Sequence, residues 1–277
     1  MLPDTVGPYR LLEPLGAGTL GTLHRARDLE RGRSVALRVL RSDRGDDPAD
    51  PEAVLGAARK IAALSHPAIA AIYDWGHADA VAFIASEFVP GDQLSAMVHG
   101  APLHPRQALE FAAQMADGLA AAHAHDLRHD ALTAAAVRIT PKGAAKILDV
   151  GMFAWTAARA RAPQDDRAGV GAVLFEMLTG RPLRPGWPAE FRAREIPVGV
   201  QPVLRKLASV DAGEQYGSMA FAAAALRAAA SAVAVSADER PDAAAPMTPA
   251  DGRPWGTVLV AALALVLVAA IAWWLTN

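Results

Sequence analysis

The sequence predicts an α+β protein with a small β-rich N-terminal part, a helical C-terminal part and one transmembrane helix. Between Gly7 and Leu40, short stretches of alternating apolar residues are separated by glycines, which is typical of strands joined by tight turns. Between Pro105 and His123, apolar residues recur at every third or fourth position, which predicts an amphipathic helix. Between Val258 and Leu275, no residue is charged or strongly polar, and roughly 20 apolar residues suffice to cross a bilayer.

The composition limits the classes of protein and partner. The chain has 277 residues, enough for one large domain with a well-buried core. Its formal net charge of -2 gives no reason to expect nucleic acid as a partner. No cysteine is present, so disulfides and thiolate metal sites are excluded, which suits a cytosolic domain.

Three regions follow from these patterns: a folded domain at 8–230, a flexible linker at 231–255 and a single transmembrane helix at 256–275. The linker is rich in alanine, proline, aspartate and serine and has no hydrophobic periodicity. Arg253 precedes the apolar run and no positive charge follows it, so the positive-inside rule places the folded domain in the cytoplasm. The alternative is a buried hydrophobic helix, which the lack of any polar face disfavours.

A glycine-rich turn is expected within the first hairpin. Gly16, Gly18 and Gly21 have the spacing G-x-G-x-x-G, in which glycine lets backbone N–H groups approach phosphates because no Cβ blocks them. A plain hairpin turn is the alternative interpretation. The next strand, expected from Ser34 to Leu40, contains V-A-L-R.

Further elements are expected on either side of the long helix. Ala53 to Leu64 has helical spacing, whereas Ala68 to Tyr73 and Ala80 to Ser86 are expected to form strands. The segment 129–151 is expected to contain a loop, two short strands around a turn at 141–143, and a stop at Asp-Val-Gly. Later helices are expected at Ala168–Gly180, Val203–Val210 and Ser218–Ala230.

These motifs, in this order, resemble those of the bacterial Hanks-type Ser/Thr protein kinases. The counterparts are the glycine spacing, V-A-L-R for V-A-I-K, S-H-P-A-I for x-H-P-N-I, His129 with the later Asp-Val-Gly for D-F-G, and E-M-L-T-G-R-P. The resemblance implies a two-lobed protein kinase fold, with a small β-rich N-lobe and a helical C-lobe. It also implies ATP and Mg²⁺ as cofactors and the bacterial inner (cytoplasmic) membrane as location.

The same resemblance assigns roles to residues. Asp149 would be the Mg²⁺ ligand, and Glu87 and Val89 would lie in the hinge that holds adenine through the backbone. Asp166 would anchor the catalytic loop from below. The full set implied for nucleotide binding is Gly16, Gly18, Gly21, Arg38, Glu87, Val89 and Asp149.

Five positions depart from the family pattern at residues that carry its chemistry. Arg38 replaces the lysine that holds the α- and β-phosphates, and Ala57 replaces the glutamate paired with that lysine. Ala131 replaces the catalytic aspartate. Thr133 replaces a phosphate-contacting lysine, and Ala136 replaces the asparagine that holds a second metal ion.

No shift of the alignment restores the lysine replaced by Arg38 or the asparagine replaced by Ala136, because Lys60 is the first lysine and Asn277 is the only asparagine. Arg138 stands where the family has a leucine beneath adenine; it either places a charge under the base or points to solvent after local drift. The loop after Gly151 is short and lacks A-P-E, so we expect no platform for a peptide substrate, and Thr156 is its one hydroxyl phosphosite.

We therefore expect a degenerate, membrane-anchored member of the family: a pseudokinase that acts as a binding or scaffold module for a cytoplasmic protein partner and has no catalytic residue. One alternative is an atypical active Ser/Thr kinase that uses Arg38, Asp130 and Asp149. Another is a nucleotide-sensing binder without catalysis. A metal cluster around His123 and His129 is disfavoured, because on the kinase frame both histidines have structural positions.

Overall fold

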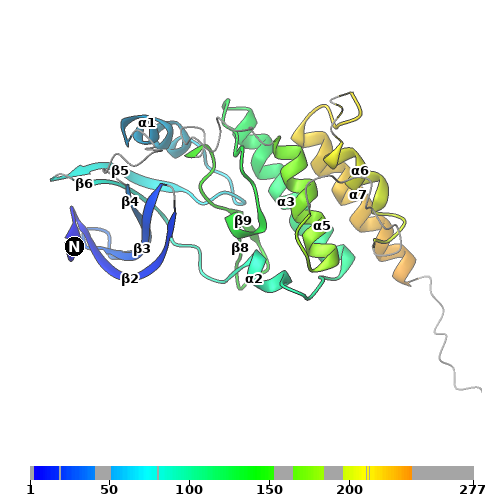
Figure 1. The fold of residues 1–277 in the computed structure, drawn as a ribbon, viewed down its shortest axis with the longest axis horizontal. Coiled ribbons are helices and arrows are strands. Elements are labelled where there is room, and N and C mark those ends of the chain that lie inside the picture. Colours follow the sequence, from blue (N-terminus) through cyan, green and yellow to red (C-terminus); the bar gives the residue numbers. More distant parts are fainter. Residues whose placement is uncertain are drawn as a thin grey trace, which may run out of the picture. The chain divides into compact units, whose positions relative to one another are not determined.

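A six-stranded antiparallel sheet forms from the N-terminal part of the chain, in the order β1-β2-β3-β4-β6-β5 (Figure 1). The computed structural model describes residues 3–18, 20–40, 51–79, 81–152, 165–183, 196–209, 211 and 213–238. The strands are β1 (Thr5–Val6), β2 (Tyr9–Gly18), β3 (Gly21–Asp28), β4 (Arg33–Leu40), β5 (Ile72–Ala78) and β6 (Val81–Glu87).

The side chains of β4 point alternately to the two faces of this sheet, as successive side chains of a strand do. Leu37 belongs to a small core on one face that also contains Tyr9 and Phe83, whose rings pack edge to face with centroids 5.5 Å apart. Arg38 therefore points to the other face. Helix α1 (Pro51–Ala62) packs against β5 and β6 and joins the larger core on that side.

A three-stranded sheet and the remaining helices form the second lobe. Helix α3 packs against β9 and α5, and α5 packs against α6. The sheet contains β7 (Asp92–Gln93), β8 (Val137–Ile139) and β9 (Ala145–Ile147). The helices are α2 (Leu94–Val98), α3 (Pro105–His123), the 3-10 helix η1 (Ala134–Ala136), α5 (Asp166–Thr179), α6 (Gln201–Ala208) and α7 (Met219–Asp238).

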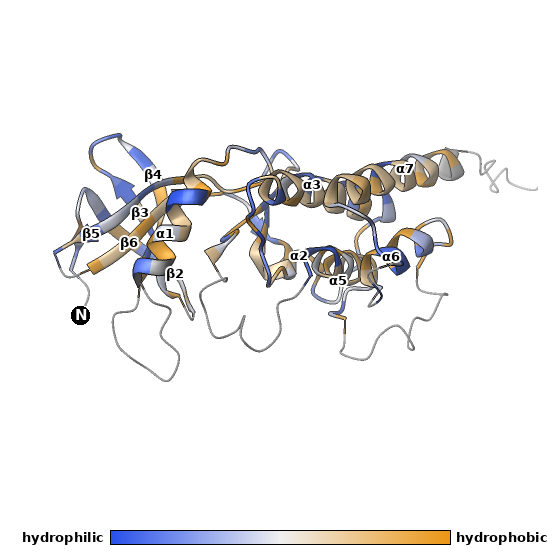
Figure 2. Ribbon diagram, turned by 90° about the horizontal axis from the view of Figure 1, so that it is seen from above, coloured by the Kyte–Doolittle hydropathy of each residue, from blue (hydrophilic) through white to orange (hydrophobic). Residues whose placement is uncertain are grey.

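Helix α3 spans the residues expected from its periodicity and forms the centre of this lobe. Figure 2 shows apolar residues along much of α3 and α7. The stripe predicted from the sequence is fully buried, at 0% exposure for Leu109, Ala112, Ala116, Leu119 and Ala122. Helix α7 also buries an apolar stripe at helical spacing, which consists of Met219, Ala222, Ala223, Leu226, Ala229 and Ala230.

One expected strand begins later than predicted. Strand β5 starts at Ile72, and the preceding residues form a parallel bridge with β9 instead. The Ala70 N–H donates to the Ile147 carbonyl at 2.9 Å, and the Ile147 N–H donates to the Ala68 carbonyl at 2.8 Å. The apolar pattern that predicts a strand from Ala68 is therefore satisfied by pairing across the two lobes.

Helix α7 continues past its expected end at Ala230 and through Asp238. The extension is rich in alanine, which has the highest helix propensity, so helix continues into the first part of the segment expected to be a linker. The chain divides after Ala237 into two units, Met1–Ala237 and Asp238–Asn277, and the site described below lies in the first.

The described residues have the two-lobed α+β architecture that the motifs predicted, with a β-rich N-lobe and a helical C-lobe. In this part of the chain, no helix is long and apolar enough to cross a membrane. The predicted transmembrane segment 256–275 lies outside the described residues, as do Thr156 and the linker beyond Asp238.

Candidate functional site

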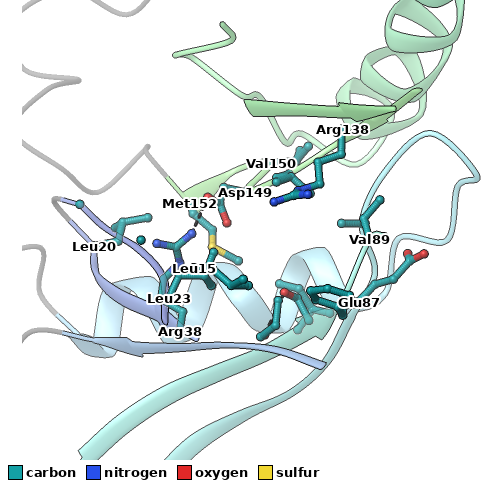
Figure 3. Close-up of a pocket in the computed structure, with 18 of the residues that line it drawn as sticks. Leu15, Leu20, Leu23, Arg38, Glu87, Val89, Arg138, Asp149, Val150 and Met152 are labelled. Atoms are coloured by element: carbon teal, nitrogen blue, oxygen red, sulfur yellow. Dashed lines mark hydrogen bonds and ion pairs between the residues drawn. The ribbon is translucent and has the colours of Figure 1, made fainter. Parts of the chain in front are cut away.

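A cavity of about 290 Å³ is lined by residues of both lobes (Figure 3). It brings together six of the seven residues expected to bind nucleotide: Gly16, Gly18, Arg38, Glu87, Val89 and Asp149. Gly21, the seventh, is buried in β3 beside the hairpin turn and is not among the lining residues. The predicted site is therefore one place in the fold.

The glycine-rich turn joins β2 and β3, where Gly18 pairs with Gly21. A Cβ added to Gly18 would meet no atom within 4 Å, and Gly18 is exposed beside the cavity. Packing within the described residues thus does not require glycine at position 18. Close approach of a ligand to the backbone remains as a physical reason for it.

Arg38 forms an ion pair with Asp149 across the cavity. The Arg38 Nη2 donates to Asp149 Oδ2 at 2.5 Å, although the two residues are 111 positions apart in the sequence. Exposure is 10% for the arginine side chain and 25% for the aspartate side chain. A charge-assisted contact of this length in a partly buried site is among the stronger protein hydrogen bonds, so the carboxylate of Asp149 is bound to a protein cation.

Asp149 is held in an uncommon backbone conformation, with φ of 55°. Asp130 is similar, with φ of 61°. Aspartate adopts the left-handed region more readily than most residues, but the conformation still costs roughly 1 kcal/mol or more and is concentrated at functional sites. Both residues lie in the segment 129–151, which the sequence predicts to be a loop, two short strands and a stop at Asp-Val-Gly.

Arg138 lines the cavity, and its contact with Gly91 is exposed to solvent. Its half-buried side chain extends from β8 into the cavity (Figure 3), and Nη1 donates to the Gly91 carbonyl at 2.6 Å. The sequence left two orientations open, and the side chain has features of both, because it lines the cavity while its hydrogen bond is exposed to solvent.

The segment after β6 is tied to the other lobe by a second ion pair. Lys146 of β9 donates from Nζ to Glu87 Oε2 at 2.7 Å, with side-chain exposures of 18% and 24%. The same carboxylate oxygen accepts from the Ala71 N–H at 3.3 Å. Glu87, predicted only to offer its backbone, therefore also links the lobes through its side chain. Sequence reasoning missed its partner Lys146, which lies outside the cavity lining.

Asp166 organises the loop that begins at His129. Its buried carboxylate accepts from the backbone N–H groups of His129 at 3.0 Å and of Asp130 at 2.9 Å. It also contacts His123 Nε2 at 2.7 Å. Burial by itself raises the pKa of Asp166, but the hydrogen bonds from His123, His129 and Asp130 outweigh burial and hold that pKa below its ordinary value. The anchoring role predicted for Asp166 matches this geometry.

His129 joins the loop to the strand end that carries Asp149. Its Nδ1 accepts from the Ala131 N–H at 3.3 Å, and its Nε2 lies 3.1 Å from the Leu148 carbonyl. A ring that accepts at Nδ1 and faces a carbonyl at Nε2 is neutral, with the proton on Nε2. Complete burial lowers the pKa of His129 and outweighs the opposing charges of Asp166 and Asp149.

The remaining positions singled out in the sequence lie around this centre. Ala57 is buried in the core of α1 at 4% exposure. Ala131 and Ala136 are half-buried and Thr133 is exposed. None of these four lines the cavity. In the described part of the chain, no group of three or more histidine, aspartate or glutamate side chains could hold a metal ion, and the cluster around His123 and His129 does not form.

Comparison with known proteins agrees with this geometry. A family model for the protein kinase domain matches residues 9–165. The Ser/Thr protein kinase PknB of Mycolicibacterium smegmatis is 33% identical over 204 residues, which cover 63% of this chain and 33% of that protein. The Ser/Thr protein kinase PrkC of Bacillus subtilis is 29% identical over 199 residues, covering 63% and 31%. The chain thus spans about a third of the length of these relatives.

Solved structures show the same fold. The crystal structure of the Mycobacterium tuberculosis PknI kinase domain superimposes with a TM-score of 0.68 and 21% sequence identity, covering 83% of this chain and 100% of that one. At that identity the match concerns the fold alone. With the family model covering more than half of the sequence and the cavity lined by the expected motifs, this chain belongs to the protein kinase domain family, and the relatives it resembles are bacterial Ser/Thr kinases.

Proposed function

We propose that this chain is a pseudokinase: a membrane-anchored, kinase-like protein that does not transfer phosphate and acts as a binding or scaffold module in signalling. The observation that carries the proposal is the ion pair between Arg38 and Asp149 at 2.5 Å. It joins the cation expected to hold phosphates directly to the carboxylate expected to hold metal, so each group neutralises the other.

The side chains at positions 131 and 57 support the same proposal. Phosphoryl transfer is accelerated by positioning and by charge stabilisation, and a carboxylate orients the attacking hydroxyl. Ala131 stands at the position of that carboxylate. Ala57 is buried among apolar residues of α1 and offers no negative partner to Arg38, which bonds Asp149 instead.

The family implies Mg²⁺ bound with ATP, and the residues present do not fit that ion. Magnesium prefers hard, anionic oxygen ligands in octahedral geometry. The Asp149 carboxylate is occupied by the Arg38 guanidinium, and Ala136 has no side-chain oxygen to offer. A metal ion would have to displace a buried guanidinium, which would then lose its charge partner.

The proposal also includes the location and the partner. The apolar segment 256–275 anchors the protein in the bacterial inner membrane, with the kinase-like domain in the cytoplasm. A module without catalysis acts through what it binds, and we propose a cytoplasmic protein as that partner. No nucleic acid is proposed, because the net charge is -2.

A transfer assay with radiolabelled ATP tests the central claim. The full chain in detergent is incubated with Mg²⁺-ATP and a generic protein substrate, and autophosphorylation is followed in parallel. We expect no transfer above the level of an Asp149→Asn variant, which keeps a residue that tolerates positive φ. The PknB kinase of M. smegmatis, measured beside it, serves as the positive control.

The alternative is an atypical active Ser/Thr kinase, as the names of its relatives suggest. It predicts transfer that disappears in Asp149→Asn and falls in Asp130→Asn, because Asp130 is the nearest carboxylate in sequence to position 131. That result would sink the pseudokinase proposal. Transfer that both variants retain would point to a contaminating kinase and would leave no activity attributable to this chain.

A further inference from the structure

A row of polar side chains crosses four strands of the N-lobe sheet on one face. Thr5 of β1 pairs with Arg10 of β2. Arg10 pairs in turn with Arg27 of β3, which pairs with Ser34 of β4. Side chains of directly paired residues point to the same face of a sheet. None of these four residues, which we call the arginine row, lines the cavity, so the row is a separate surface.

The two arginines lie directly opposite each other, which is an unfavourable arrangement. Paired residues of antiparallel strands have Cβ atoms roughly 4.5–5.5 Å apart, and like charges in such a pair are destabilising. Both Arg10 and Arg27 are exposed. In the part of the chain that the structure describes, neither side chain forms a hydrogen bond or an ion pair. The sheet therefore presents two adjacent positive charges that its own residues do not neutralise.

The carboxylates of the same strands have other positions or other partners. Glu13 pairs with Arg25 at 3.0 Å. Asp28 belongs to the opposite face of the sheet, where it is buried at 0% exposure and accepts from two backbone N–H groups of the following turn. Asp4 and Glu30, at strand ends, are exposed and form no ion pair with the row among the described residues. An anion that binds the row must therefore come from outside this lobe.

The row fits a phosphate group that carries two negative charges. A phosphorylated serine or threonine has a charge of roughly −1.5 to −2 at pH 7 and three acceptor oxygens. Two neighbouring guanidiniums match that charge with planar sets of donors, and the hydroxyls of Thr5 and Ser34 add a donor at each end of the row. A single carboxylate would leave one guanidinium unpaired. Anionic membrane surfaces are recognised by clusters of roughly 4–8 basic residues, more than the two in this row.

We propose that the arginine row binds a phosphorylated serine or threonine in a segment of a partner protein, with Arg10 and Arg27 holding the phosphate. Recognition of phosphorylated segments by clustered arginines is a general mode of protein binding. The inference rests on the proposed binding role and specifies the chemistry of the partner. It uses a face of the sheet outside the cavity, so it requires neither a nucleotide nor Mg²⁺.

Fluorescence anisotropy with a labelled phosphothreonine peptide tests this on the full chain in phosphatidylcholine nanodiscs. The phosphothreonine is flanked by alanines, and two matched peptides carry threonine or glutamate in its place. We expect the phosphorylated peptide to bind at least tenfold more tightly than either control peptide. Its affinity should fall as salt is added, because exposed charges are screened. Phosphatidylglycerol vesicles, added as a competitor, should not displace it.

Substitution of both arginines identifies the site. The double variant Arg10→Gln with Arg27→Gln should bind the phosphorylated peptide at least tenfold more weakly. Its control, Arg59→Gln with Arg106→Gln, removes two charges from exposed positions of α1 and α3 and should bind as the unaltered chain does. The thermal unfolding midpoint of the first variant should be no lower than that of the unaltered chain, because a repulsive pair is removed. A purely structural role of the arginines would instead lower this midpoint.

Four results would overturn the inference: binding of either control peptide as tight as that of the phosphorylated one, unchanged binding in the folded arginine variant, a lowered unfolding midpoint in that variant, and displacement by phosphatidylglycerol vesicles, which would assign the row to lipid. None of these depends on the transfer assay. Phosphoryl transfer together with phosphopeptide binding would remove only the pseudokinase proposal, whereas no transfer and no phosphopeptide binding would remove only this one.

Discussion

At the scale of single residues, the presence of arginine at position 38, where the family has lysine, explains the ion pair across the cavity. Arginine is always charged and presents several donors in a rigid plane, so Arg38 on the cavity face of β4 needs an anionic partner. Position 57 on α1 is alanine and supplies none. The guanidinium instead reaches Asp149 at 2.5 Å. Two substitutions that look independent in the sequence are therefore linked through one charge.

The coupling between Arg38 and Asp149 predicts a non-additive effect on stability. Asp149→Asn leaves Arg38 buried without its charge partner, and we expect it to cost roughly 1–3 kcal/mol, less than for a fully buried pair because the aspartate is partly exposed. Arg38→Met alone should also destabilise. The double variant should lose about 1 kcal/mol or more less stability than the two single variants lose together. Urea denaturation measures all three free energies of unfolding.

The matched control is the surface pair of Arg106 and Glu110, whose contact is 2.8 Å but whose side chains are 57% and 48% exposed. An exposed helical pair of this kind contributes about 0.3–0.5 kcal/mol. A coupling energy for Arg38 and Asp149 no larger than that value would mean that the ion pair does not stabilise the cavity.

Buried His129 predicts how stability depends on pH. Burial lowers its pKa in the folded chain, so below about 6.5 the unfolded chain takes up a proton that the folded chain does not. The free energy of unfolding therefore decreases as the pH falls below neutral, by up to about 1.4 kcal/mol per pH unit for one group. Asp166, with its lowered pKa, contributes in the same direction only below about 4.

The variant His129→Gln isolates this contribution, because glutamine can donate to the Leu148 carbonyl and does not titrate. Urea midpoints measured between pH 7.5 and pH 5 should fall more steeply for the unaltered chain than for the variant. Equal slopes would show that protonation of His129 is not linked to unfolding.

At the scale of elements, the antiparallel pairing of β7 with β8 holds Arg138 in the cavity through one glycine. Gly91, just before β7, has φ of 111°, and a Cβ there would lie 2.1 Å from the Ile139 carbonyl oxygen. Its own carbonyl receives Arg138 at 2.6 Å. The close approach of two backbones thus also positions the acceptor for the cavity arginine.

Replacing this glycine should disturb both the pairing of β7 with β8 and the cavity. Gly91→Ala is expected to destabilise the fold by about 2 kcal/mol or more, through a strained backbone and an overpacked contact. Gly56→Ala is the control, since a Cβ there would meet no atom within 4 Å and Gly56 lies inside α1; it should stabilise by about 0.5–1 kcal/mol. Thermal unfolding of both variants gives the comparison, and a neutral Gly91→Ala would contradict the argument.

Elements governed by local periodicity could be predicted from the sequence. Helix α3 has the bounds expected from the sequence, because one buried stripe determines them. Strands β8 (Val137–Ile139) and β9 (Ala145–Ile147) lie on either side of the turn, as expected. Strand β5 could not be located, because Ala68 and Ala70 pair with a strand nearly 80 residues away. Pairings such as Glu87 with Lys146, 59 positions apart, depend on the tertiary fold and leave no local signal.

At the scale of the whole molecule, the large core joins residues of both lobes while the chemistry around the cavity has changed. That core extends from Leu40 and Ile84 in the sheet through α1 to Leu119 and Leu226 in the helical lobe. Some glycines lie at tight helix contacts: a Cβ added at Gly169 would lie 3.0 Å from the Cβ of Leu132. The proposed binding role needs only this packing, because binding depends on the shape of the fold, whereas phosphoryl transfer depends on a few charged groups.

The last prediction concerns the apolar segment 256–275. If it spans the bilayer, the chain should sediment with membranes and remain there after washing with high salt and with alkaline carbonate, which remove peripheral proteins. A chain that ends after 255 should be released. Leu265→Arg places a charge near the middle of the segment, where insertion costs about 2.5–3.5 kcal/mol, and should weaken retention, whereas Leu265→Ile should not. Release of the unaltered chain by carbonate would contradict the anchor. Protease added to inside-out vesicles should digest the kinase-like domain, because Arg253 on its side of the segment favours a cytoplasmic location.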